Sequence, residues 1–168
     1  MADVRGRLLR LASELEDERA VAGEIARVAL ADSVELRAAE AAAQARALAA
    51  VVALDLHRWY TALESMLERI ERVFGTLPTG PEWHRDLLGG ASSAIVGVRP
   101  AILPKAVMPP LRELLGLRHF LRHAYAVEFE PSKLLDRAGD LLAVSDTVTA
   151  AITAFVGFLR TSAEALES

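Results

Sequence analysis

Apolar residues recur along this chain at the spacing of an α-helix. Over residues 52–74 they follow one another at alternating intervals of three and four, which places them on one buried face of a helix. That face consists of Val52, Leu56, Trp59, Leu63, Met66, Ile70 and Phe74. The sustained alternation of period two that marks strands, and the Asn-Gly or Asp-Gly pairs that mark hairpins, are missing from the sequence. The pattern predicts an all-α protein.

The breaks between apolar stretches divide the chain into five predicted helices. We expect them over residues 4–31, 34–74, 82–95, 111–125 and 131–165. Asp32 and Ser33 lie at the first break, where such side chains end one helix or cap the next. Pro131 suits the first turn of the last helix, because the N–H that proline lacks has no partner there. Helices of these lengths predict an antiparallel bundle, with residues 1–168 forming one domain.

Composition narrows the class of protein. Hydrophobic residues make up 52% of the chain, which is high for a soluble monomer, so we expect part of the apolar surface to form an oligomer interface. Cysteine is absent, which excludes a disulfide scaffold, a thiolate metal site and a catalytic cysteine. No run reaches the ~18 apolar residues of a membrane span, and residues 1–11 lack the apolar segment of a signal peptide. We expect a cytoplasmic protein that does not contact membranes.

Charge is distributed unevenly. The net charge of −4 argues against general coating of nucleic acid. Residues 1–75 hold ten Arg and thirteen acidic residues, whereas residues 99–137 hold seven Lys or Arg and four acidic residues. The basic region contains the octet Arg118-His119-Phe120-Leu121-Arg122-His123-Ala124-Tyr125, in which four of the eight residues are Arg or His. This octet is the candidate site.

The spacing within the octet decides which side chains meet. Arg118 and Arg122 are one helical turn apart, and so are His119 and His123. Arg118 and His123 are separated by about 140° around an ideal helix. One protomer therefore spreads these residues around a helix end. Two protomers placed face to face would bring both sets into one cleft.

Such a cleft suits the chemistry of phosphodiesters. Arginine binds a phosphate and stabilises added negative charge, and a histidine with a pKa near neutrality moves protons to and from ribose hydroxyls. RNA carries its own nucleophile, the 2′-hydroxyl, so this chemistry needs no metal ion. Tyr125 would stack on a base or accept a modifying group. The alternative is a basic helix end that only complements the helix dipole.

Other kinds of site find less support in the sequence. His119 and His123 are four residues apart and would reach one metal ion together, but a His-Glu-x-x-His pattern and a third ligand are missing. Two solvent-facing histidines are the favoured interpretation. The Gly-x-Ser-x-Gly elbow of serine hydrolases and the phosphate-binding loop are absent as well. We expect no cofactor and no metal.

Several residues outside the octet are assigned to structure or to solvent. Glu64, Glu68 and Arg72 lie four apart, and we expect them on the outer face of their helix, where they pair weakly. Glu71 is expected on a solvated face too. Structural roles are assigned to His57, Tyr60, Trp83 and His84. Arg99 is a further, weaker candidate for the lining of the cleft.

The octet resembles a known signature. Arg118, four intervening residues, His123 and then Ala124 and Tyr125 resemble the motif of HEPN-domain ribonuclease toxins of the HepT kind. Further stretches are similar to the longer HepT-like proteins. They are residues 54–64, residues 77–80, the pair Trp83-His84 and residues 97–101. The resemblance covers roughly residues 50–160.

The resemblance implies a helical bundle that dimerises, with a composite cleft containing both copies of the motif. It implies metal-independent RNA cleavage in which Arg118 and His123 are the catalytic residues, in the toxin of a type II toxin–antitoxin pair. The partner would be a minimal nucleotidyltransferase antitoxin of the MNT type, which transfers AMP to the motif tyrosine, here Tyr125. The added charge and bulk would occupy the place where an RNA phosphate must sit.

The chain departs from the family at His119, where Asn or Asp is frequent. His119 would act as a second proton-transfer group or bind phosphate, and Arg122 adds a cation for RNA binding. Two functions stay open at this point: the ribonuclease toxin, and a non-catalytic helical module that binds a nucleotide or a nucleotidyltransferase. The acidic net charge and the apolar composition favour the module slightly, whereas the crowded octet favours the nuclease.

Overall fold

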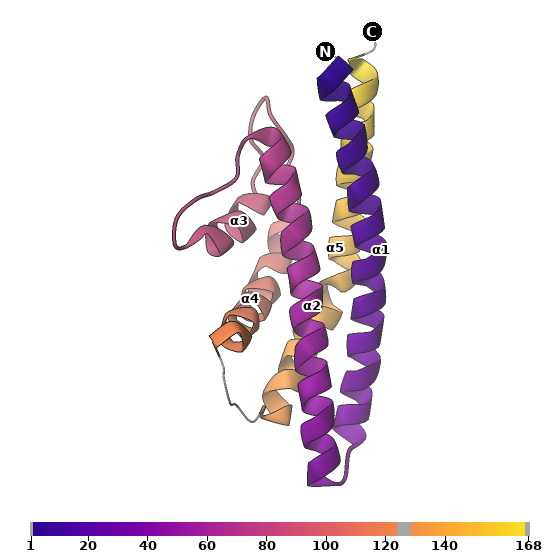
Figure 1. Cartoon of the computed structure of the whole chain (residues 1–168), viewed down its shortest axis with the longest axis vertical. Helices are drawn as coiled ribbons and strands as arrows, with labels where there is room; N and C mark the ends of the chain where they lie inside the picture. The colour runs from indigo at the N-terminus through magenta and orange to yellow at the C-terminus, as the bar shows by residue number, and fades with distance from the viewer. Residues whose placement is uncertain (1, 124–128, 167–168) are drawn as a thin grey trace.

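The computed structural model describes residues 2–123 and 129–166, and it is built almost entirely of helices. The elements in chain order are α1 (Ala2–Ala38), α2 (Ala42–Phe74), α3 (Trp83–Ala91), the 3-10 turn η1 (Lys105–Val107), α4 (Met108–His123) and α5 (Pro131–Ala165). The long helices α1, α2 and α5 run along the molecule, and the short helices α3 and α4 lie on one side of α2 (Figure 1). Within the described ranges, pairing of β type is limited to an isolated bridge between Ile95 and Arg99. The prediction of an all-α bundle of about five helices is confirmed.

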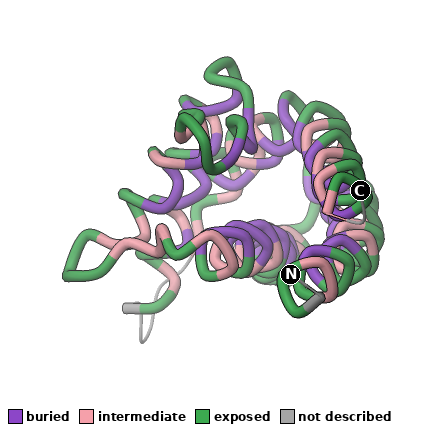
Figure 2. Tube along the Cα trace, turned by 90° about the horizontal axis from the view of Figure 1, so that it is seen from above, coloured by how far each residue is buried: buried purple, intermediate pink, exposed green. Residues whose placement is uncertain are grey.

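The predicted apolar face of α2 lies at the centre of the core. Its positions from Val52 to Ile70 are all buried. The last position, Phe74, is partly buried and packs edge-on against Phe155 of α5. Viewed from above, the long helices turn their buried residues inward and their exposed residues outward (Figure 2). The helical period of the sequence therefore identified the interior of the bundle correctly.

The helix break predicted at Asp32 and Ser33 was wrong. α1 continues to Ala38, and α2 begins only at Ala42. The hydroxyl of Ser33 donates a hydrogen bond of 2.7 Å to the carbonyl of Leu30 in the preceding turn. The polar group is therefore satisfied inside α1 and is not used to cap a new helix. The residues that follow include good helix formers, which extend α1.

The other helix ends agree with prediction to different degrees. α2 ends at Phe74 as expected, because Gly75 adopts the left-handed conformation, with φ of 71°, that closes a helix. α5 spans its predicted range. α3 stops at Ala91, earlier than predicted, because the chain turns back in the Ile95–Arg99 bridge. α4 begins earlier than predicted, with two prolines in its first turn, where the missing N–H has no partner to lose.

The composition of α5 would also allow a membrane helix. Its most apolar 18 residues have a mean hydropathy of 1.7, and 33% of that window is buried. Length and composition alone give only weak evidence, because the core helix of a soluble bundle has the same properties. α5 packs on α1, α2 and α4 and contributes Leu141, Ile152 and Phe155 to the core. It is thus a core helix that also leaves apolar side chains such as Leu142 exposed.

Candidate functional site

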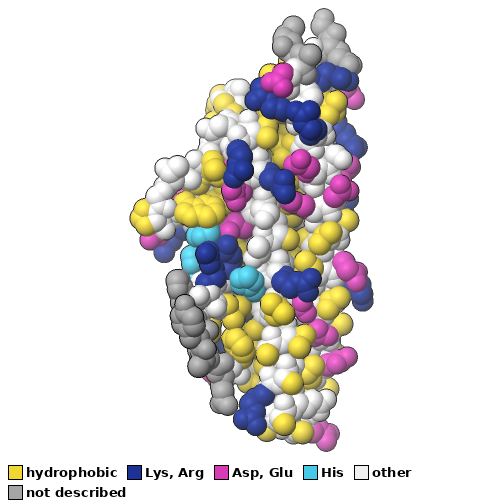
Figure 3. Space-filling view, in the orientation of Figure 1, with side chains coloured by type: hydrophobic (Ala, Val, Ile, Leu, Met, Phe, Trp, Pro, Cys, Tyr) yellow, Lys and Arg dark blue, Asp and Glu magenta, His cyan; other side chains and the backbone are white. Residues whose placement is uncertain are grey.

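The octet belongs largely to α4, and α4 packs against both α2 and α3. Histidine and arginine side chains gather on the face of the molecule where these three helices meet (Figure 3). The candidate site therefore draws on three segments that are far apart in the sequence. Its geometry depends on how α2, α3 and α4 pack.

Arg118 projects from α4 into the interior, where only 7% of its surface is exposed. Its Nη2 donates a hydrogen bond of 2.5 Å to Oε1 of Glu64 on α2. Glu64 is itself 6% exposed, so its predicted place on the outer face was wrong. A carboxylate buried this deeply needs a cationic partner, because an unpaired charge is poorly solvated inside a protein. Arg118 supplies that partner.

The sequence contained a signal for the burial of Glu64. Tyr60, Glu64, Leu67 and Glu71 follow one another at intervals of four, three and four, and all are buried. They form a second inward-facing strip beside the predicted apolar face of α2. Acidic residues in register with apolar ones identify such a strip. Burial also raises the pKa of the Tyr60 phenol, which agrees with the structural role predicted for it.

His84 of α3 is the third member of this cluster. Its Nδ1 lies 2.8 Å from Oε2 of Glu64, so each oxygen of the carboxylate contacts a different partner. The imidazole stacks on Trp83 with ring centroids 3.7 Å apart, and it meets the ring of His119 edge-on at 5.4 Å. His84 was interpreted as structural from the sequence. The structure connects it to Arg118 through Glu64.

Residues at the rim of the cluster are more accessible. His119 and Arg122, both predicted to bind RNA, lie on the exposed side of α4. Partial burial lowers the pKa of His119, and the charges of His84 and Arg118 lower it further. The pKa of His57 on α2 is lowered in the same way, first by partial burial and then by the two arginines of the octet. The lowered pKa favours the neutral form of both imidazoles, which is the form that can accept a proton.

Two donor groups of Arg118 remain unused. Its Nε and Nη1 are buried and have no hydrogen-bond partner among the described residues. A guanidinium has five N–H donors in a fixed fork, and a buried donor without an acceptor costs about 1–3 kcal/mol. Arg118 therefore keeps two buried N–H donors that no described residue uses.

The second half of the motif is described only in part. α4 ends at His123, five residues after Arg118. The side chain of His123 and the whole of Tyr125 lie outside the described residues. Helix geometry alone directs positions 118 and 123 to different sides of α4, about 140° apart.

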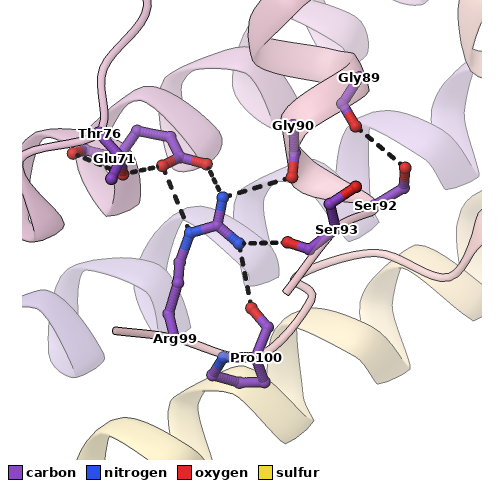
Figure 4. A network of polar contacts seen from close by, with 8 residues as sticks. All are labelled: Glu71, Thr76, Gly89, Gly90, Ser92, Ser93, Arg99 and Pro100. Atoms are coloured by element: carbon purple, nitrogen blue, oxygen red, sulfur yellow. Dashed lines mark hydrogen bonds and ion pairs between the residues drawn. The ribbon is translucent and has the colours of Figure 1, made fainter. Parts of the chain in front are cut away.

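Arg99 does not line the site, contrary to expectation. It is 4% exposed and forms a buried ion pair with Glu71, which was wrongly predicted to be solvated. Its Nη1 donates to the carbonyls of Ser93 and Pro100 at 2.9 and 3.0 Å, and Nη2 donates to that of Gly90 at 3.3 Å (Figure 4). Arg99 therefore ties the end of α3 and the loop after it to α2, and this fixes the helix that carries His84.

The described residues contain no group of three or more His, Cys, Asp or Glu side chains able to hold a metal ion. The pair considered from the sequence, His119 and His123, is described for its first member only. Among the described histidines, His84 contacts Glu64 and His119 rather than a set of converging ligands.

Comparison with known families identifies the bundle. A family model described as HepT-like protein matches residues 51–159, which include most of α2, all of α3 and α4, and most of α5. The chain belongs to the HepT-like family. Neither a curated protein nor a solved structure shows significant similarity to it.

Membership makes the protein a HEPN-type, toxin-like module from a family related to HEPN ribonucleases and associated with toxin–antitoxin systems. The matched region contains Glu64 and His84 as well as the octet. All of α1 and the beginning of α2 precede the match. The resemblance found in the octet is thereby confirmed at the level of the family.

Proposed function

We propose that this HepT-like protein is the ribonuclease toxin of a type II toxin–antitoxin system, acting in the cytoplasm as a homodimer. The observation that carries the proposal is the state of Arg118. It is a buried guanidinium within the HepT-like motif, fixed by Glu64 through one nitrogen and unpartnered at two others among the described residues. Such a group is preorganised to bind a phosphate and to stabilise the charge that develops during cleavage.

In the proposed reaction the RNA provides the nucleophile. The 2′-oxygen forms a bond to the adjacent phosphorus as its proton passes to a histidine. The bond from phosphorus to the 5′-oxygen breaks, and that oxygen receives a proton. The products are a 2′,3′-cyclic phosphate and a 5′-hydroxyl. His123 transfers protons, and Arg118 compensates the charge on the non-bridging oxygens. His119 is a second proton carrier, whose lowered pKa favours the neutral imidazole that can act as the acceptor.

Dimerisation would bring the two halves of the motif together. Within one protomer, positions 118 and 123 point to different sides of α4. A second protomer packed against the end of α4 would place its own His123 near the Arg118 of the first. The 48% exposure of Phe120, which lies between the two positions, supports an apolar contact there. Arg122 remains exposed and would contact the RNA backbone.

We further propose that a nucleotidyltransferase antitoxin silences the protein through Tyr125. The phenolic oxygen would form a bond to the α-phosphorus of ATP, with loss of its proton and release of pyrophosphate. Support comes from the position of Tyr125, two residues after the last residue of α4. The added phosphate carries negative charge into the region that would hold RNA phosphates.

The decisive experiment measures RNA cleavage by the protein alone and after co-expression with a neighbouring nucleotidyltransferase, together with intact mass. We expect cleavage by the unmodified protein, and loss of cleavage when AMP is added at Tyr125. Arg118→Ala and His123→Ala should each abolish cleavage while the far-ultraviolet circular dichroism stays helical. Cleavage that survives in both variants would remove the catalytic assignment.

The second candidate is a non-catalytic module that binds a nucleotidyltransferase. The net charge of −4 and the inward direction of Arg118 favour it. A tight complex with the nucleotidyltransferase, without cleavage of RNA by the unmodified protein, would select this function over the first.

A further inference from the structure

A pocket of about 420 Å³ lies between α3 and α4, next to the buried contact of Glu64 and Arg118. His84 and Arg85 of α3 form one wall, and Arg112 and His119 of α4 form the other. Its polar lining thus consists of two guanidinium groups and two imidazoles. The single carboxylate in the lining is that of Glu82.

The balance of charge in this pocket favours an anion. Glu82 pairs with Arg85 at 3.0 Å, so these two charges compensate each other. Arg112 is exposed and has no ion-pair partner in the part of the chain that the structure describes. One uncompensated guanidinium therefore faces a cavity whose other polar groups are the Arg85–Glu82 pair and two imidazoles. Arginine in such surroundings binds phosphate groups through parallel N–H donors.

The pocket is also coupled to the proposed catalytic arginine by direct contacts. The Glu64 carboxylate contacts Arg118 at 2.5 Å through one oxygen and His84 at 2.8 Å through the other. His84 forms part of the pocket wall and fixes the distance from that wall to Arg118. His119 follows Arg118 directly in the chain and also lines the pocket. A group bound in the pocket would therefore be separated from a group bound by Arg118 by the side chains of His84 and Glu64.

We propose that this pocket binds a phosphate of the RNA strand adjacent to the phosphate at which cleavage occurs, with Arg112 as its main contact. The inference rests on the proposed ribonuclease function and adds a subsite to it. It also assigns α3, through His84, a part in binding the substrate. The subsite would set the register of the strand, because contacts to backbone phosphates fix how a protein is positioned on a nucleic acid.

Gly116 provides a way to test the charge of the pocket separately from its shape. It lines the pocket from α4, and a Cβ atom built on it meets no other atom within 4 Å. There is room for the first side-chain carbon at this position, so Gly116→Glu introduces a carboxylate at the pocket and Gly116→Gln a neutral side chain of the same size. Glutamate and glutamine are both better helix formers than glycine, so both variants should fold.

The experiment measures binding of a fluorescein-labelled 2′-O-methyl RNA of about twelve nucleotides by fluorescence anisotropy over a range of salt concentrations. This probe lacks the nucleophilic hydroxyl and stays intact. Arg112→Ala should weaken binding several-fold and reduce the slope of log K against log salt by about one. Gly116→Glu should weaken binding more than Gly116→Gln. Arg37→Ala is the control, because Arg37 is exposed in the last turn of α1 and forms no ion pair with the residues that the structure describes.

The outcomes separate this inference from the proposed function. Cleavage of unmodified RNA by the wild type, combined with normal probe binding by both Arg112→Ala and Gly116→Glu, would overturn the subsite and leave the ribonuclease standing. Equal weakening by Gly116→Glu and Gly116→Gln would overturn the charge argument. A wild type that neither binds nor cleaves RNA would refute the proposed function, and the subsite with it.

Discussion

Two buried ion pairs on α2 look alike and differ in one respect. Glu71 pairs with Arg99, and Glu64, two helical turns earlier, pairs with Arg118. All four side chains are almost fully buried. Every nitrogen of the Arg99 guanidinium has an acceptor in the protein. In Arg118 only Nη2 has one among the described residues.

The difference teaches that burial of a charged residue does not by itself distinguish structure from function. A buried arginine whose donors are all satisfied fixes the segments around it and has no free N–H group for a ligand. In one with unused donors, the surrounding residues leave part of the guanidinium without an acceptor. The number of satisfied donors, rather than the presence of an ion pair, is why we propose a role in the site for Arg118 and a role in the fold for Arg99.

The largest expected effect is on stability. Arg99→Ala should lower the free energy of unfolding by about 3–5 kcal/mol, because it leaves Glu71 charged and buried. Arg118→Ala should lower it less, since His84 still pairs with Glu64. Urea denaturation followed by circular dichroism compares the two variants. Equal losses would remove the distinction drawn between the pairs.

The next effect is on catalysis. Glu64→Gln keeps the shape of the side chain but weakens its hold on Arg118 and His84, so cleavage should slow by up to about a hundredfold through misplacement of the guanidinium. The matched variant, Glu71→Gln, should lose stability and keep its kcat per folded molecule. Steady-state cleavage assays, normalised to the folded fraction, give kcat and KM separately. A similar fall in kcat for both variants would contradict the assignment.

The smallest effect concerns pH. His57 and His119 have lowered pKa values in the folded protein, so the unfolded chain takes up protons first as the pH falls below about 6.5. Their contribution to stability is present above that pH and is lost as the pH decreases toward the folded pKa values. Melting temperatures at about pH 7.5 and about pH 5.5 should show a small decrease, reduced in the double variant His57→Gln/His119→Gln. If the melting temperature of that variant falls by as much as that of the wild type, the pH dependence arises from other groups.

The fold could be predicted almost completely from the sequence. The apolar positions of α2 and the exact range of α5 followed from helical periodicity and from proline at the first turn, which are local properties of the chain. The error at Ser33 arose because the same hydroxyl can cap a new helix or bond back to Leu30. Local sequence does not decide between these two hydrogen bonds.

The site could be predicted only in part. The motif indicated Arg118, and the resemblance it carried agrees with the family found for residues 51–159. Glu64 and His84 were missed, because each was judged by its own segment. Glu64 was expected in a charged row on the outer face of its helix, and His84 was assigned a structural role. Their roles appear only when α2 and α3 meet α4.

The sequence by itself determined the helices, the apolar face that each long helix buries, and the family to which the chain belongs. These features depend on residue type and on spacing over a few helical turns, and both can be read from the sequence. Only the tertiary structure decided that Arg118 contacts a carboxylate 54 residues away and that His84 shares that carboxylate. It also decided that Arg99 uses its donors within the protein. Contacts between distant residues depend on how whole helices pack, and helical periodicity specifies which face is buried without specifying which neighbour will cover it.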